Sequence, residues 1–145
     1  MIALLQRVLE ASVTINGHRR AEIGPGLCVL VGVQHNDDTD SSEKLVQRLL
    51  HYRVFADEAG RMNLSLLDAG GELLLVPQFT LAADTAKGRR PGFSTAANPE
   101  RATALFDDFC DRARTRLPEL QTGQFGADMK VALINDGPVT FWLEI

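Results

Sequence analysis

The first part of the chain has the pattern of extended strands. Apolar and polar residues alternate around Val13 and Ile15, at the end of a long apolar-rich run and directly before Asn16-Gly17. Asn-Gly is the strongest short signal for a β-hairpin, because both central residues of the favoured turn need positive φ. The continuous apolar run GLCVLVGVQ at 26–34 has the length and β-branched content of a buried strand. We therefore predict a hairpin followed by a central strand.

Two later stretches have the three- and four-residue spacing of amphipathic helices. The first begins in capping-box style at 40–43 and runs to about Arg53. The second is capped by Asn98, begins at Pro99 and ends at Pro118. The apolar positions of the first are Leu45, Val46, Leu49 and Leu50, and those of the second are Ala102, Leu105, Phe106, Phe109, Ala113 and Leu117. Each helix therefore has one apolar face that can pack on a sheet.

Between the two helices, two apolar runs flank the pair Gly70-Gly71. They are NLSLL at 63–67 and ELLLVPQFTL at 72–81, and they predict two strands around a tight turn. The next segment, Ala82 to Ala97, is small, polar and contains glycine and proline, so we predict a long loop there. Loops of this length are often functional.

The chain ends with two apolar runs, 125–135 and 139–145, on either side of Asp136-Gly137-Pro138. Asp136-Gly137 alone would serve a two-residue hairpin, whereas Pro138 also fixes φ and removes a backbone donor. From the residues alone we predict a stiff turn between two strands. Six or more strands with two helices indicate an α+β fold, a mostly antiparallel sheet or barrel-like β core covered by two main helices, in a single domain spanning 1–145.

Composition places the chain among ordinary globular proteins, with 45% apolar and 23% charged residues. Polar residues interrupt the first apolar run, and no apolar run approaches the roughly 20 residues of a membrane span, so we expect a cytoplasmic protein with no signal peptide and no membrane association. Cys28 and Cys110 lie in apolar contexts, which suits buried free thiols in a reducing compartment.

A net charge of −4 gives the chain no overall attraction for nucleic acid, and no DNA partner is expected. Lys87, Arg89 and Arg90 nevertheless fall together in TAKGRRPGF, within the predicted long loop. These three cations either contact phosphates or form a solvated loop, and the residues alone leave both interpretations open.

Sequence motifs for common cofactors and metals are missing. The chain has no dinucleotide-binding loop, no P-loop, no G-x-S-x-G elbow and no H-E-x-x-H, and its three histidines are not spaced as ligands of one metal. We expect neither a cofactor nor a metal. Gln78 and Thr80 remain, as polar residues two apart in an apolar strand directly before the long loop, so they share a face. They indicate a small-molecule site or a solvent-facing sheet edge.

Six motifs in the same order resemble the D-aminoacyl-tRNA deacylase family over the whole chain. They are LQRV, IGPGLCVLVGV, QFTL, RRPGFS, TGQFGADMKV and NDGPVTFWLEI. The resemblance implies an ester hydrolase that releases the amino acid from the 3′ end of D-aminoacyl-tRNA, and from mischarged glycyl-tRNA. It further implies a homodimer in which Gly137-Pro138, joined by a cis peptide bond, enters the partner subunit's site and rejects L-amino acids.

The resemblance also implies roles for individual residues. The amides around Phe79 and Thr80 would stabilise the oxyanion of acyl transfer. No histidine or lysine lies beside Thr80 to activate its hydroxyl, so we expect attack by water, aided by the 2′-hydroxyl of the substrate, with Thr80 and Gln78 positioning the reactants. Met129 is interpreted either as a pocket-lining residue or as ordinary strand packing.

One residue departs from the family pattern. The family commonly has serine where this chain has Pro77, so no role of a serine hydroxyl transfers, and proline puts the local strand pairing in question. The main alternative is therefore a catalytically impaired module of the same fold that binds the tRNA end. A further alternative is an interaction domain whose Gly-Pro element only stabilises a dimer.

Overall fold

The computed structural model describes residues 1–145, and its first two strands form the predicted hairpin. β1 (Ile2–Ile15) and β2 (His18–Ile23) are antiparallel, and the turn residues Asn16 and Gly17 have φ of 50° and 77°. Both values are positive, as the turn chemistry required. β3 (Gly26–Gly32) follows as the predicted central strand, between β1 and β6 (Glu72–Pro77).

The α+β prediction is confirmed, but the sheet is mixed. The strand order is β2-β1-β3-β6-β7, with β7 at Gln121–Thr122, and β8 (Met129–Glu144) pairs with β1. β6 runs parallel to both β3 and β7, while β1 is antiparallel to its three neighbours. Helical crossovers between β3 and β6, and between β6 and β7, return each strand in the same direction, which parallel pairing requires.

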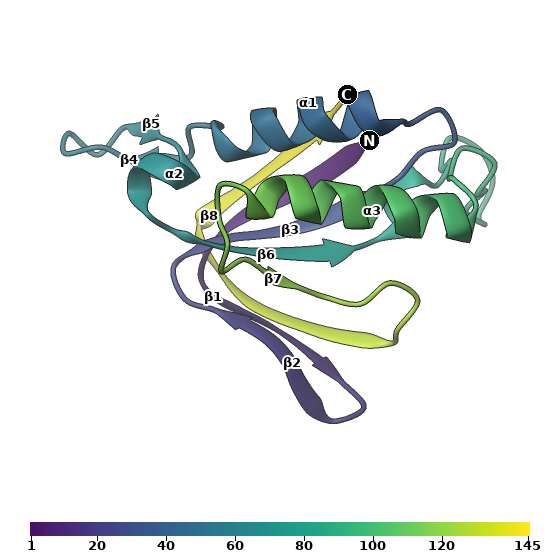
Figure 1. Ribbon diagram of the computed structural model, residues 1–145, viewed down its shortest axis with the longest axis horizontal. Coiled ribbons are helices and arrows are strands. Elements are labelled where there is room, and N and C mark those ends of the chain that lie inside the picture. The colour runs from purple at the N-terminus through teal and green to yellow at the C-terminus, as the bar shows by residue number, and fades with distance from the viewer.

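The two main helices cover one face of the sheet, as Figure 1 shows. They are α1 (Thr39–Leu50) and α3 (Pro99–Arg114). Leu49 of α1, Leu75 of β6 and Phe109 of α3 are fully buried in the core between them. Burial of a side chain of this kind stabilises the fold by about 1.5–3 kcal/mol. None of the helices has the length and apolar composition needed to cross a membrane.

A second, smaller core lies on the opposite face of β3 and β6. Cys28 and Leu74 alternate with residues of the main core along these strands and pack with Ile23 of β2. The sheet therefore curls, so that β2 contacts β6 and β7. This curl gives the β core its barrel-like character.

The helix boundaries differ from the predicted ones. Asp38, not the predicted 40–43 segment, caps α1, because its carboxylate accepts a hydrogen bond from Ser41 N at 2.9 Å. The helix ends at Leu50 rather than near Arg53. α3 begins as predicted, with Asn98 as its cap, but ends at Arg114.

The predicted strand at 63–67 is wrong in its second half. β5 (Met62–Leu64) is a strand and pairs with β4 (Phe55–Ala56), but Ser65 then caps the short helix α2 (Leu66–Ala69). The Ser65 hydroxyl accepts from Asp68 N at 3.2 Å and so favours a helical turn.

Several carboxylates have lowered pKa values, which predicts an acid-labile fold. The Arg112 guanidinium of α3 lies 2.5 Å from the Glu43 carboxylate of α1 and lowers the pKa of Glu43. Such a group stabilises the fold above its ordinary pKa, and this contribution is lost as pH falls through the lower folded value. We expect the melting temperature to be constant from pH 7 to about 5 and to fall below about pH 4.

Glu43→Gln should flatten this fall relative to Glu58→Gln, which alters an exposed loop glutamate that makes no ion pair. Thermal melts of both variants and the parent between pH 3 and pH 7 test this expectation. Identical acid profiles for Glu43→Gln and the parent would show that the link between α1 and α3 does not set the acid limit.

Candidate active site

The strand predicted to run to residue 81 ends at Pro77. Pro77 is buried and pairs with Val31, and Gln78 N then donates to Val31 O at 2.7 Å, so strand pairing is kept despite the proline. The chain turns at once into η1 (Phe79–Ala82), a short 3-10 helix. The prediction that Gln78 and Thr80 share the face of a strand is therefore wrong.

Gly32 at the end of β3 allows η1 to approach the sheet. A Cβ atom at this position would lie 2.9 Å from Leu81 Cβ and 3.1 Å from Gln78 O. Only a residue without a side chain accepts such contacts. The sequence did not reveal this role of Gly32, because the glycine lies in an uninterrupted strand pattern. The residues that approach it, Gln78 and Leu81, are 46 or more positions later in the chain.

The turn η1 exposes groups that can act on an acyl ester. Gln78 Nε2 donates to Thr80 Oγ1 at 2.5 Å, and both Phe79 and Thr80 are exposed. The N–H groups of Phe79 and Thr80 are the first two of the 3-10 helix, so they have no acceptor within it. They also donate to no other group of the chain. Backbone amides that lack an acceptor can stabilise an oxyanion without a titratable side chain.

Two hollows lie on either side of η1. Thr80 borders a hollow of about 520 Å³ together with Gln34 and Trp142. Phe79 borders a second hollow, of about 290 Å³, together with Pro77 and Phe125. The turn therefore separates a partly polar space from a mainly apolar one.

Met129 does not border the second hollow, but it contacts Gln124, which precedes Phe125 of that hollow. Its sulfur accepts a hydrogen bond from Gln124 N at 3.3 Å, and a side chain at Gly123 would meet this sulfur at 2.8 Å and Pro77 Cδ at 3.3 Å. Met129 is half-buried at the start of β8, beside the second core. It thus contacts the backbone that supports Phe125.

Gly137 and Pro138 form a bulge within one strand and not the predicted turn between two strands. β8 pairs with β1 on both sides of them, and Arg7 alone of β1 stands opposite residues 136–139. The peptide bond between Gly137 and Pro138 is cis. A bulge keeps the ladder on each side and leaves the extra residues unpaired, and Gly137 and Pro138 are exposed.

Arg7 of β1 contacts the residue that precedes Gly137 in this bulge. Its Nε lies 3.2 Å from Asp136 O and 3.0 Å from the Asp136 carboxylate, and its Nη1 donates to Val54 O at 2.6 Å. Asn135 closes the bulge from within β8, because its Oδ1 accepts from Val139 N at 2.7 Å. In the sequence Arg7 stands out only as part of the motif LQRV, and nothing in its spacing indicates a contact with residues 129 positions later.

Gly137 is required by its backbone and its surroundings. Its φ is +136°, and a Cβ atom there would lie 2.6 Å from Val139 Cγ2 and 3.0 Å from Val139 N. No other residue type meets both conditions without a shift of the bulge.

The bulge and η1 lie apart within one chain. Trp142 borders the hollow of Thr80, and Pro138 lies four positions earlier in the strand, which is about 13 Å at about 3.3 Å per residue. The hollow that Thr80 borders includes neither Gly137 nor Pro138. The structure therefore brings Gln78, Phe79 and Thr80 together, places Met129 nearby, and leaves Gly137-Pro138 separate.

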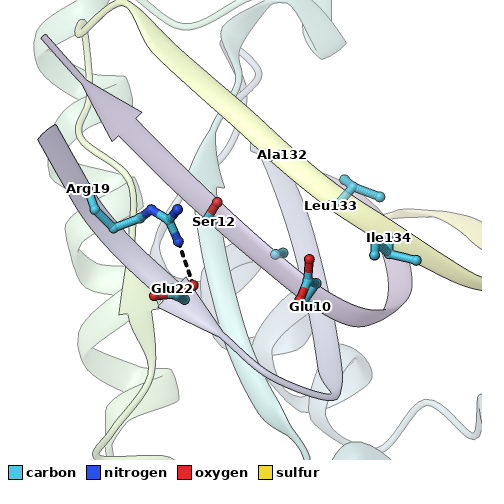
Figure 2. A pocket seen from close by; sticks show the side chains of 8 residues that line it. Glu10, Ser12, Arg19, Glu22, Ala132, Leu133 and Ile134 are labelled. Carbon is cyan, nitrogen blue, oxygen red and sulfur yellow. Dashed lines mark hydrogen bonds and ion pairs between the residues drawn. The ribbon is translucent and has the colours of Figure 1, made fainter. Parts of the chain in front are cut away.

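Other parts of the molecule offer less chemistry. A hollow of about 270 Å³ between β1, β2 and β8 has polar groups, but its Arg19 is paired with Glu22 at 2.5 Å, and Leu133 and Ile134 form its wall (Figure 2). No group of three or more His, Cys, Asp or Glu side chains is placed to hold a metal. Burial raises the pKa of Cys28 to about 11 and that of Cys110 to about 12, so neither thiol ionises near neutral pH.

Backbone amides without an acceptor, at an exposed turn, are compatible with the oxyanion stabilisation that hydrolases use in acyl transfer. The family model for D-Tyr-tRNA(Tyr) deacylase matches residues 4–144. A D-aminoacyl-tRNA deacylase of Enterobacter sp. (strain 638) is 56% identical, and one of Escherichia coli O1:K1 / APEC is 55% identical, each over 145 residues and 100% of both chains. The chain belongs to the D-aminoacyl-tRNA deacylase family.

Two solved structures share this fold. That of a c-Myc DNA Unwinding Element Binding Protein has a TM-score of 0.96 at 42% identity, and the match covers 100% of this chain and 99% of the other. That of a probable eukaryotic D-amino acid tRNA deacylase has a TM-score of 0.89 at 19% identity, covering 99% of this chain and 98% of the other. The second likeness concerns the fold alone.

Proposed function

We propose that the protein hydrolyses the ester bond of D-aminoacyl-tRNA and of mischarged glycyl-tRNA, with residues 1–145 acting as one deacylase domain in the cytoplasm. The observation that carries this proposal is the turn η1, where Phe79 and Thr80 are exposed, have amides without an acceptor and border the two hollows. Membership of the deacylase family supports the same substrate class.

In this mechanism water attacks the ester carbonyl, and the amides of Phe79 and Thr80 donate to the oxyanion that forms. The tetrahedral intermediate then collapses, the bond to the ribose 3′-oxygen breaks, and this oxygen takes up a proton as tRNA leaves. The hydrogen bond between Gln78 and Thr80 fixes the threonine hydroxyl that positions the reactants. The 2′-hydroxyl of the terminal ribose assists proton transfer, because no titratable side chain of the turn is available.

The apolar hollow beside Phe79 suits the terminal base of the tRNA. Phe79 and Phe125 give it aromatic walls, and base stacking on aromatic side chains contributes about 1–3 kcal/mol per base. Met129 supports this wall through its contacts with Gln124 and Gly123 rather than by lining the hollow itself.

Selection against L-amino acids needs a second copy of the chain. β8 pairs only with β1 and leaves its other edge open, where Val131, Ile134 and Trp142 are 37%, 49% and 48% exposed. An open edge with apolar side chains favours association. In the homodimer, Gly137-Pro138 of one subunit reaches η1 of the other, and its carbonyl groups accept from the substrate amino group while leaving no space for an L side chain.

Release of amino acid from matched D-tyrosyl-, L-tyrosyl- and glycyl-tRNA by the purified protein tests the proposal. We expect the D and glycyl esters to be hydrolysed and the L ester to be spared, and light scattering to give a dimer. Equal hydrolysis of the D and L esters would reject the chiral filter.

The alternative is a catalytically impaired module that binds the tRNA end. Pro77 motivates it, since the family serine is missing, although Pro77 keeps its pairing with Val31. Binding of tRNA without release of any amino acid would select this alternative. We expect no DNA partner, because the net charge of −4 gives the chain no overall attraction for nucleic acid and duplex DNA carries no aminoacyl ester for η1 to act on, and a duplex DNA binding measurement at the same salt checks this point.

A further inference from the structure

The cationic loop, residues 84–92, begins beside the Thr80 hollow. Asp84 and Thr85 of this loop border the hollow, and Lys87, Arg89 and Arg90 are exposed beyond them. No acidic residue occurs between Thr85 and Ala97. A positively charged loop therefore stands beside the site in an otherwise acidic chain.

The three cations of the loop make no ion pair or hydrogen bond within the chain. Most of its 15 basic side chains make an ion pair or a hydrogen bond to an oxygen of the chain. The basic side chains that make neither are Arg20, Lys44, Lys87, Arg89, Arg90 and Arg116. Half of these free cations are thus gathered in one loop, while the other half are scattered over the surface.

Backbone hydrogen bonds hold the cationic loop in shape. Asp84 N donates to Gly92 O at 2.8 Å, and Gly92 N donates back to Asp84 O at 2.9 Å. The Asp84 carboxylate accepts from Ala86 N at 2.9 Å, so the only acidic group of the loop is turned to its own backbone. A loop that is ordered before binding loses less entropy when a ligand docks.

The residues that follow the cationic loop contact η1. The Phe93 ring lies 5.2 Å from the Phe79 ring, centroid to centroid, at an interplanar angle of 46°. The Thr95 hydroxyl donates to Ala82 O of η1, and Thr95 O accepts from His35 N at 2.9 Å. The backbone that follows the cationic loop is therefore tied to η1, which keeps the loop beside the amides of Phe79 and Thr80.

We propose that the cationic loop binds backbone phosphates at the 3′ end of the tRNA and thereby sets the position of the ester over η1. This inference rests on the proposed function, and Lys87, Arg89 and Arg90 are the contacting residues. It explains how an acidic protein attracts a polyanion at one place only, since local cations steer and hold phosphate where the net charge does not.

Binding of uncharged tRNA at several salt concentrations tests the inference with a matched pair of variants. The loop variant is K87A/R89A/R90A, and the control variant is R20A/K44A/R116A, which removes the same charge from the scattered free cations. Each single-strand phosphate that the protein no longer neutralises lowers the slope of log K against log[salt] by about 0.7, so we expect a reduction of about 2 for the loop variant. The control variant should keep the parent slope.

Turnover gives a second readout that separates this inference from the proposed function. The loop variant should raise KM for D-aminoacyl-tRNA at least tenfold more than it raises KM for the D-aminoacyl ester of adenosine, which has no phosphate. Equal slopes for the loop and control variants would reduce the effect to net charge and overturn the inference. If the parent cleaves neither ester, the proposed function fails. The salt dependence of tRNA binding still tests whether the loop binds phosphates.

Discussion

Replacing Phe79 with proline is expected to lower kcat for D-aminoacyl-tRNA by about 10²–10³-fold, the usual effect of removing one oxyanion-hole donor. Proline removes the N–H group of residue 79, which is the first amide of η1 and has no other partner in the chain. Proline suits the first position of a helix, and Gln78 before it, with φ of −143° and ψ of 84°, lies outside the α region that a following proline disfavours.

Phe79→Ala is the matched control, since it also removes the ring but keeps the amide. The loss of kcat/KM in Phe79→Ala should come mainly from KM, because the ring borders the apolar hollow and packs against Phe93. Single-turnover kinetics of both variants, with thermal melts to confirm folding, separate the two effects. If Phe79→Pro and Phe79→Ala have the same kcat, the amide of residue 79 does not stabilise the oxyanion.

Local sequence signals predicted the elements whose causes are local. The hairpin at Asn16-Gly17 needs only two residues with positive φ, and the cap at Asn98 needs one side chain that reaches the amide of Arg101. The start of α1 was misplaced because Asp38 and Asp40 both suit a cap, and only Asp38 is bonded to Ser41 N. Such errors arise where neighbouring residues compete for the same role.

The geometry of the site depends on partners that are distant in the sequence. Residues 72–81 have the apolar pattern of one strand. However, β3 ends at Gly32, and because this glycine has no side chain, the chain after Pro77 can turn into η1 close to it. Likewise, residues 129–144 have the pattern of two strands. β1 is 14 residues long and pairs with both apolar runs, so they form one strand with a bulge. Pattern and turn chemistry cannot reveal this alignment, because it is set by the pairing strand.

Replacing Gly137 with alanine is expected to lower kcat/KM for D-aminoacyl-tRNA by about 100-fold, since a displacement near 1 Å at a site can cost this much. The added methyl group would lie 2.6 Å from Val139 Cγ2 at a φ of +136°, so the bulge must shift. Gly60→Ala is the control, because Gly60 also has positive φ, at +75°, but open space around it. The control should keep its activity, and both variants should remain folded and dimeric by melting and light scattering.

Complementation between two inactive variants then decides whether the bulge acts across subunits. In a mixed dimer of a Phe79→Pro subunit and a Gly137→Ala subunit, a site built from η1 of one chain and the bulge of the other is intact once and doubly damaged once. We expect mixing by co-expression to restore up to half of the parent activity per dimer, while each variant alone stays inactive. If both elements served the same chain, every site of the mixed dimer would contain one lesion, and no activity would return.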